Sequence, residues 1–184
     1  MKTKFLLPLA LALSLPAFAK DKDGVHMEDH LEVATKSLTL NGMGTREVSI
    51  FAVKVYIAGL YLETPTHDAN QVINSNQLKV VTMQFVHEVP EKNIKETWTE
   101  SISKSCGANC APFQARIGQL VNAMQGVAVG DHFEFVFMPD GVEYKFNGQF
   151  KVRIAGADFG RMLLGMWFGA NPPNAKLKSG MLGI

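Results

Sequence analysis

The first apolar run of the chain differs from every later one. Lys2 and Lys4 make the extreme N-terminus positive, and residues 5–15 are then rich in Leu and Ala. This run is shorter than the roughly 20 apolar residues that a membrane-spanning helix needs. Small residues follow at the two positions that a signal peptidase reads, in segment 17–19. We therefore predict a secretory signal peptide at residues 1–19; an uncleaved amphipathic anchor is the alternative.

Alternating polar and apolar positions dominate the chain from Leu31 onward and predict β-strands. Such alternation, rich in β-branched and aromatic residues, is typical of strands with one buried face. The predicted strands are 38–40, 46–51, 53–62, 78–86, 132–137, 142–146 and 149–154. Two glycines in Asn41–Gly44 predict a turn after the first strand, and Asp140–Gly141 predicts a hairpin turn. Residues 20–30 are polar, so we expect a loose N-terminal arm.

Apolar residues at helical spacing predict helices between and after the strands. The predicted helices are 71–74, 91–103, 112–124, 159–168 and 174–179. Pro90 and Pro112 suit first helical turns, Asp158 is predicted to cap the fourth helix, and Gly169 ends it. The sum is an α+β fold, an antiparallel sheet of six or seven strands with the helices packed on one side.

The composition indicates one soluble domain at residues 20–184, which fits the usual size of a domain. A net charge of +1 without a basic stripe argues against binding to nucleic acid. We expect no stable membrane insertion after signal cleavage, because no later apolar stretch is long enough, and no lipid anchor, because no Cys follows the cleavage site. Nine Met and twelve Phe suit ordinary core filling, and flexible Met also suits an irregular apolar cavity.

The two cysteines are Cys106 and Cys110, only four positions apart. In an oxidising compartment an even number of cysteines favours a disulfide, and Gly107 and Asn109 allow the tight turn that a small ring needs. A metal site would need further ligands beside them. We predict a Cys106–Cys110 disulfide, with free thiols, and less so a redox or metal site, as the alternatives.

His26 and His30 stand four residues apart, which is the spacing of metal ligands on a helix. The segment has no apolar face to fix such a helix, so we expect a solvated arm rather than a metal site. We expect no metal and no cofactor in this protein.

Three stretches of the chain, in this order and spacing, resemble the chalcone isomerase-like family. They are 40–46 with 50–63, the hairpin 130–148, and 159–174. The resemblance covers about residues 38–182 and implies an open-faced β-sandwich. The family includes plant chalcone isomerases, which cyclise a flavonoid precursor, and fatty-acid-binding proteins, which hold a fatty acid in the same cleft.

The resemblance assigns individual residues to that cleft. Arg46 matches the arginine that both groups place there, and Tyr56 falls where the binders carry a tyrosine and the isomerases a catalytic threonine. The spacing between the two also follows the binders. Met166 stands where the isomerases have a serine or threonine, and their polar residues on a middle helix have no counterpart between Trp98 and Met124. The resemblance therefore implies a binder rather than an isomerase.

Arg46 and Tyr56 together suit the recognition of a carboxylate. A buried guanidinium needs an anionic partner, and its planar fork offers two parallel hydrogen bonds to a carboxylate, to which a phenol adds a third. We expect Met162, Met166, Phe159 and the helix that begins at Pro112 to line an acyl tunnel.

Structural roles for the same residues stay open. In this alternative, Arg46 pairs with Glu47, Glu63 or another structural carboxylate. Tyr56 then packs on the sheet with its hydroxyl at the surface. The Met-rich helix that carries Met166 is then plain core.

The leading hypothesis is a non-catalytic periplasmic binder of a fatty acid or a similar apolar acid, held by Arg46 and Tyr56. An isomerase or lyase that acts on a small aromatic substrate is one alternative, although no His or carboxylate is placed in the cleft by the sequence. An envelope protein with a structural or partner-binding role and no ligand is the other. The sequence leaves the oligomeric state open.

Overall fold

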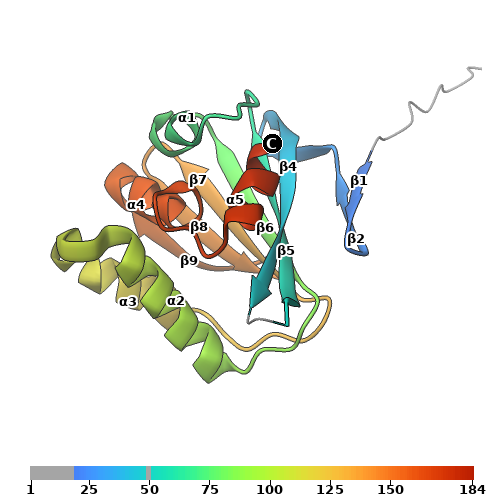
Figure 1. The fold of residues 1–184 in the computed structure, drawn as a ribbon. Coiled ribbons are helices and arrows are strands. Elements are labelled where there is room, and N and C mark those ends of the chain that lie inside the picture. The colour runs from blue at the N-terminus through green and yellow to red at the C-terminus, as the bar shows by residue number, and fades with distance from the viewer. Residues whose placement is uncertain (1–18, 49–50) are drawn as a thin grey trace, which may run out of the picture.

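In the computed structural model, which describes residues 19–48 and 51–184, the chain forms a curled antiparallel sheet with helices on one side (Figure 1). The strands neighbour one another in chain order, so each pairs with the next. They are β3 (His30–Val33), β4 (Lys36–Val48), β5 (Val53–Leu62), β6 (Lys79–Phe85), β7 (His132–Met138), β8 (Gly141–Phe146) and β9 (Gln149–Ala155). The predicted α+β fold class is confirmed. The predicted signal peptide lies, apart from its last residue, outside the described residues.

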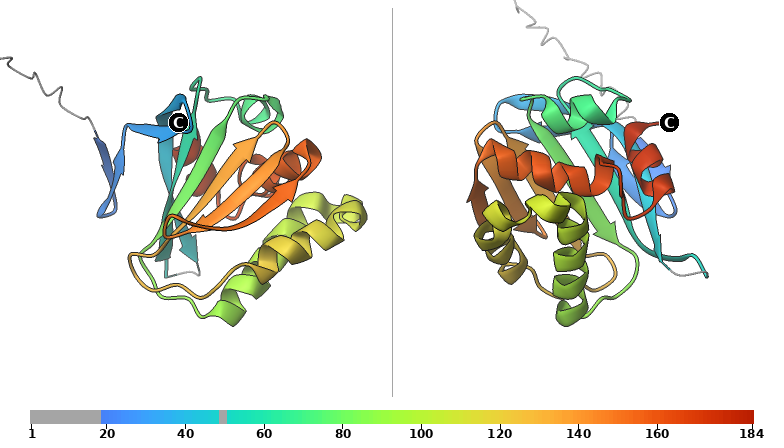
Figure 2. Two further views of the ribbon diagram at one scale, coloured as in Figure 1. Left: turned by 180° about the vertical axis from the view of Figure 1, so that it is seen from behind. Right: turned by 60° about the vertical axis from the view of Figure 1, so that its left-hand side comes forward.

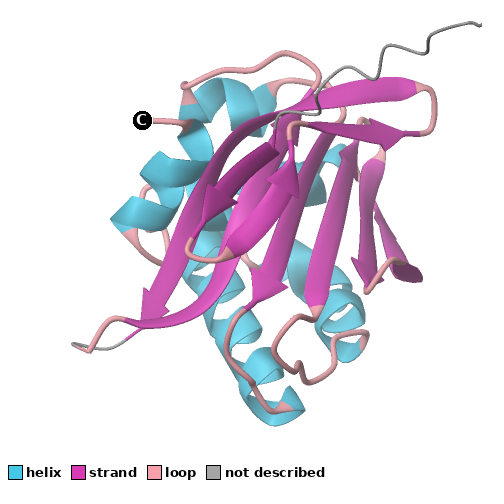
Figure 3. Ribbon diagram, turned by 90° about the vertical axis from the view of Figure 1, so that its right-hand side faces the viewer, coloured by secondary structure: helices cyan, strands magenta, loops and turns pink. Residues whose placement is uncertain are grey.

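The helices cover one face of this sheet, as the views in Figures 2 and 3 show. They are α1 (Ala69–Asn74), α2 (Glu91–Cys106), α3 (Gln114–Asn122), α4 (Ala157–Phe168) and α5 (Ala175–Leu182), with 3₁₀ turns at Gly107–Asn109 and Ala111–Phe113. In the part of the chain that the structure describes, no helix is both long and apolar enough to cross a bilayer.

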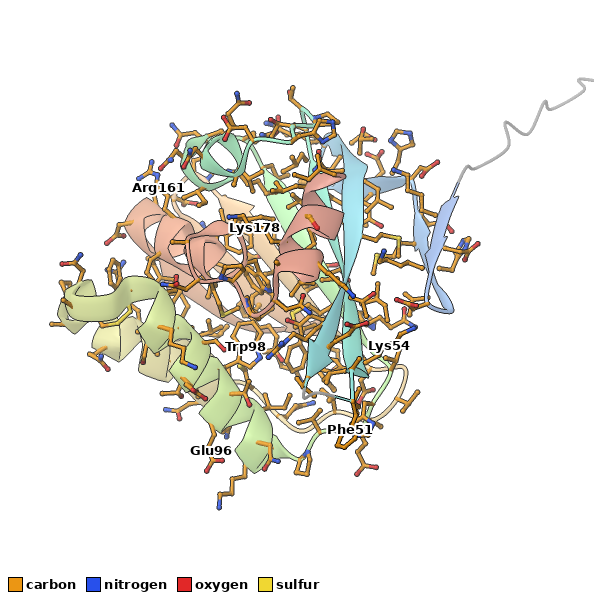
Figure 4. All side chains as sticks on the ribbon, in the orientation of Figure 1. Phe51, Lys54, Glu96, Trp98, Arg161 and Lys178 are labelled. Atoms are coloured by element: carbon orange, nitrogen blue, oxygen red, sulfur yellow. A yellow bond between two sulfur atoms is a disulfide. The ribbon has the colours of Figure 1, made fainter. Side chains whose placement is uncertain are left out.

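Helix α2 meets the sheet through a narrow stripe of side chains. Its buried residues are Ile94, Trp98 and Ile102, spaced four apart, so they lie on one side of the helix. Trp98 points from α2 toward the sheet, whereas Glu96 points away from it (Figure 4). The remaining faces of α2 are polar, and this helix therefore forms one wall of the interior rather than passing through it.

The predicted loose arm at residues 20–30 is wrong. Strands β1 (Ala19–Lys22) and β2 (Val25–Glu28) form a separate hairpin that lies against the open face of the sheet (Figure 3). Val25 and Met27 are buried beneath it. Val25 and Met27 alternate with polar residues, which is a strand pattern. The pattern is short and lies among charged residues, so it was not interpreted as a strand. His26 contacts Asp21 within this hairpin and His30 begins β3.

The hairpin explains why β5 is buried on both faces. Tyr56, Ala58, Leu60 and Leu62 pack into the main core under the helices. The residues between them, such as Tyr61, belong to a second apolar cluster under the hairpin. The Tyr61 hydroxyl donates a hydrogen bond of 2.9 Å to the Glu28 carbonyl, which joins the hairpin to the sheet.

The predicted turn at Asn41–Gly44 is also wrong, because β4 runs through it with a bulge between Leu40 and Gly42. The glycines serve close packing instead of a turn. A Cβ on Gly42 or Gly44 would overlap backbone atoms of α5 at Gly180 and Leu177, respectively. The helix backbone therefore lies directly on the strand, which is an arrangement that only glycine permits.

Asp158 does not cap α4, as the sequence predicted; Gly156 occupies the N-cap position. Asp158 lies in the first turn and accepts two hydrogen bonds of 2.8 Å from Arg116 of α3. This bidentate pair, more than any other effect, lowers the pKa of Asp158 to about 2. The carboxylate therefore joins α3 to α4.

The predicted disulfide is present. Cys106 ends α2 and Cys110 follows the 3₁₀ turn, with their Cα atoms 5.0 Å apart and their sulfurs bonded. The bond closes the tight connection between α2 and α3.

Candidate functional site

A cleft runs along α2 and has two branches. The first, called here the apolar branch, has a volume of about 350 Å³ and lies between the N-terminal half of α2 and the edge where β4 ends, β5 begins and β6 ends. It is lined by Arg46, Val48, Val55, Tyr56, Phe85, His87, Glu88, Val89, Pro90, Asn93, Ile94, Thr97 and Trp98. A volume of this size lies within the usual range for small-molecule sites.

The second branch, called here the polar branch, has a volume of about 480 Å³. It lies between the C-terminal half of α2 and the segment that joins α4 to α5. Its lining comprises Arg46, Thr97, Glu100, Ser101, Lys104, Met166, Ala170, Asn171, Pro172, Pro173 and Ala175. Arg46 and Thr97 line both branches, so the two branches meet at these side chains.

Arg46 and Tyr56 lie side by side at this junction. They are directly opposite each other in the β4–β5 register, so both side chains extend from the same face of the sheet. The structure thus brings together the two residues that the sequence singled out for a carboxylate site.

The backbone fixes the Arg46 guanidinium. Its Nη1 donates hydrogen bonds of 2.7 Å to the Glu47 carbonyl and 2.9 Å to the Pro173 carbonyl. No acceptor for its Nε or Nη2 occurs among residues 19–48 and 51–184. These two nitrogens present parallel N–H groups, which match the two oxygens of a carboxylate.

Arg46 has no carboxylate partner within the described residues. Glu47 lies 3.9 Å from the Nζ of Lys176, and Glu63 forms an ion pair of 2.8 Å with Lys36. The two structural partners considered for Arg46 are therefore engaged elsewhere.

Tyr56 is buried, with 8% of its surface exposed, so its hydroxyl does not lie at the protein surface. Burial raises the pKa of Tyr56 to about 12, against smaller opposing effects from the charge of Arg46 and from the Trp167 indole. The hydroxyl is therefore protonated at neutral pH and can donate a hydrogen bond.

The two methionines differ in position. Met166 is buried and lines the polar branch. Met162 is partly buried, packs against the core and lines neither branch. Phe159 is fully buried in the core and also lies outside both branches, as does the helix α3.

The apolar lining comes mainly from residues that the sequence did not single out. Trp98 and Ile94 belong to the buried stripe of α2, and Phe85 ends β6. The spacing of Ile94, Trp98 and Ile102 was the available signal, but it does not tell a cleft wall from core. His87 and Glu88 also line the apolar branch and are exposed, although the sequence placed no His or carboxylate there.

The cleft offers hydrogen-bond donors and apolar surface. Across the described residues, no three His, Cys, Asp or Glu side chains are arranged to hold a metal ion. Arg46 and Tyr56 are hydrogen-bond donors next to the apolar branch.

Comparison with known proteins agrees with this architecture. The crystal structure of a fatty-acid binding protein from Arabidopsis thaliana superposes with a TM-score of 0.74 at 11% sequence identity. The match covers 90% of this chain and 95% of that chain, which shows a common fold. No protein with a curated description matches the sequence. The family model described as chalcone isomerase-like matches residues 19–183. The chain therefore belongs to the chalcone isomerase-like family.

Proposed function

We propose that this protein is a non-catalytic binder of a fatty acid or a similar apolar carboxylic acid, and that it works in the periplasm. The carboxylate binds Arg46 and Tyr56, and the acyl chain occupies the apolar branch of the cleft.

The observation that carries this proposal is the state of Arg46. Its guanidinium is partly buried, is fixed by two carbonyls, and has no carboxylate partner among the residues described. A cation so placed lacks the compensation that partly buried charges normally have. A ligand carboxylate supplies that compensation through the Nε and Nη2 edge.

Tyr56 suits the same ligand. Because its pKa is about 12, the hydroxyl carries its proton at neutral pH and donates to an anion rather than repelling it. The same protonation makes Tyr56 a poor general base at neutral pH, since an efficient base has a pKa near the working pH.

The apolar branch suits a hydrocarbon tail. Tyr56, Phe85, Ile94 and Trp98 supply aromatic and aliphatic walls. Each methylene buried there contributes about 0.8 kcal/mol. The tail then provides most of the affinity, and Arg46 fixes which end of the ligand lies at the junction.

Two further observations support the proposal. The Arabidopsis thaliana protein with the same fold is a fatty-acid binding protein. The Cys106–Cys110 disulfide suits an oxidising compartment, as does the signal peptide predicted at residues 1–19.

Calorimetric titration of the purified protein with palmitate and with methyl palmitate tests the function. We expect saturable binding of the acid and weaker binding of the ester, because the ester lacks the negative charge that Arg46 recognises. The absence of saturable binding by palmitate and by shorter fatty acids would contradict the proposal.

Variants locate the binding in this cleft. Arg46→Gln is expected to weaken acid binding about 10- to 100-fold, because a hydrogen bond to a charged group contributes about 1.5–3 kcal/mol. Tyr56→Phe is expected to weaken it less. Arg153→Gln is the matched control, since Arg153 pairs with Asp140 and Glu143 on the sheet and lines neither branch. Equal losses in Arg46→Gln and Arg153→Gln would rule out the carboxylate site.

A further inference from the structure

We propose that the indole N–H of Trp167 is a further hydrogen-bond donor to the ligand carboxylate, beside Arg46 and Tyr56. This inference rests on the proposed function and identifies a residue that favours acids over their esters.

Trp167 is buried completely near the end of α4, with none of its surface exposed. Its Nε1 has no hydrogen-bond partner in residues 19–48 and 51–184. Leaving a buried N–H unsatisfied costs about 1–3 kcal/mol. The indole nitrogen is a donor only, so its partner must be an acceptor.

Three aromatic rings pack against the Trp167 ring. Its ring centroid lies 5.8 Å from that of Trp98, 5.8 Å from that of Phe135 and 6.5 Å from that of Phe137. These neighbours pack the ring tightly and hold its orientation, but their side chains provide no oxygen to the N–H.

Trp167 lines neither branch of the cleft itself, but it lies next to residues that do. Its chain neighbour Met166 lines the polar branch, and its ring neighbour Trp98 lines the apolar branch. A hydrogen bond from the indole is among the smaller effects that lower the pKa of Tyr56, which places the two groups close together, although the Trp167 N–H has no partner within hydrogen-bond geometry among the described residues.

A carboxylate bound to Tyr56 places an oxygen near this N–H. Such a ligand has four lone pairs to distribute, and the guanidinium edge of Arg46 with one phenol does not exhaust them. The indole then completes a set of three donor types around one anion, and the orphaned buried donor finds its acceptor.

The indole proton of Trp167 reports this contact directly in a ¹H–¹⁵N spectrum. The chain has only two tryptophans, Trp98 and Trp167, and Trp98→Phe assigns the signals. Titration with palmitate is expected to move the Trp167 proton downfield and to slow its exchange with solvent. Methyl palmitate is expected to move it less. Saturation by palmitate with the Trp167 signal unmoved, or moved upfield, would overturn the inference.

Affinity provides a second readout. Trp167→Phe is expected to lower the acid-to-ester affinity ratio about tenfold, since it removes a donor to a charged group and keeps a ring. Arg153→Gln is the control, because Arg153 lines neither branch and its loss is expected to leave that ratio unchanged. An unchanged ratio in Trp167→Phe would overturn the inference while acid binding itself stands. Absence of palmitate binding in the unaltered protein would instead remove the proposed function.

Discussion

At the scale of single residues, two buried polar groups of the described chain lack a hydrogen-bond partner, and their positions relative to the site differ. Among the residues described, the Tyr144 hydroxyl and the Trp167 indole nitrogen are the buried side-chain groups without a hydrogen-bond partner. Neither residue lines a branch of the cleft, but the Trp167 indole lies beside the Tyr56 hydroxyl, whereas Tyr144 stacks on Phe135 with ring centroids 5.1 Å apart. We therefore assign a ligand role to the first group and none to the second.

Tyr144→Phe is expected to stabilise the protein by about 1 kcal/mol, because it removes a hydroxyl that is buried without a partner and keeps the ring. The midpoint of urea unfolding measures the change. Palmitate affinity is expected to stay the same. A clear loss of stability would mean that this hydroxyl has a hydrogen-bond partner in solution.

At the scale of elements, α5 fixes one side of the site. Its backbone packs on Gly42 and Gly44 of β4, and the carbonyl of Pro173, two residues before the helix begins, receives a hydrogen bond from Arg46. The Asn41 side chain donates to the Met181 carbonyl at 3.0 Å and strengthens the same contact. The position of Arg46 therefore depends on how closely this helix approaches the strand.

Gly44→Ala is expected to destabilise the protein by about 2–3 kcal/mol, because the new methyl group overlaps the Leu177 backbone and overpacking carries such costs. Gly118→Ala is the control. Gly118 lies in α3 with open space around it, so an alanine there is expected to stabilise the helix by up to about 1 kcal/mol. Thermal unfolding compares the two variants. Similar effects of both would contradict the close contact between α5 and β4.

The hydrophobic pattern of the sequence was enough to predict the main sheet and the helices, because alternation and helical spacing indicate which face of each element is buried. It failed where a tertiary contact decides the local structure. Gly42 and Gly44 look like turn residues, and only the approach of α5 makes them strand residues. Val25 and Met27 are buried against the face of the sheet opposite the helices. The sequence does not indicate that this face is apolar, so the N-terminal hairpin was not predicted.

The residues of the candidate site were likewise predicted only in part. Arg46 and Tyr56 were predicted from the family resemblance, and the β4–β5 register brings them together. The wall formed by Ile94 and Trp98 has the same spacing as any core-facing helix, so no pattern separates it from core. Trp167 is hydrophobic in the sequence, and its unpartnered nitrogen appears only in three dimensions.

At the scale of the whole molecule, the helices cover one face of the sheet and the N-terminal hairpin covers part of the other, and this burial reaches all three tyrosines. Tyr56 lies under the helices and Tyr61 under the hairpin. Burial raises the pKa of each of these two to about 12, and it raises the pKa of Tyr144 as well.

An alkaline titration monitored by tyrosinate absorbance tests whether the three tyrosines are buried. The folded protein is expected to keep all three tyrosines protonated at pH 10–11, whereas the chain in urea titrates near pH 10. Since the unfolded chain loses these protons first, the free energy of unfolding contributed by the tyrosines falls as the pH rises from 10 toward 12. One tyrosine ionising near pH 10 in the folded protein would show that its cover is open.

A crystal structure of the protein with bound palmitate would show directly whether Arg46 and Tyr56 hold the carboxylate. We expect the carboxylate to lie within hydrogen-bond distance of the Arg46 Nε and Nη2 and of the Tyr56 hydroxyl, with the acyl chain in the apolar branch beside Trp98. Palmitate bound with its carboxylate away from Arg46, or with its chain outside the space between α2 and the sheet, would contradict the account.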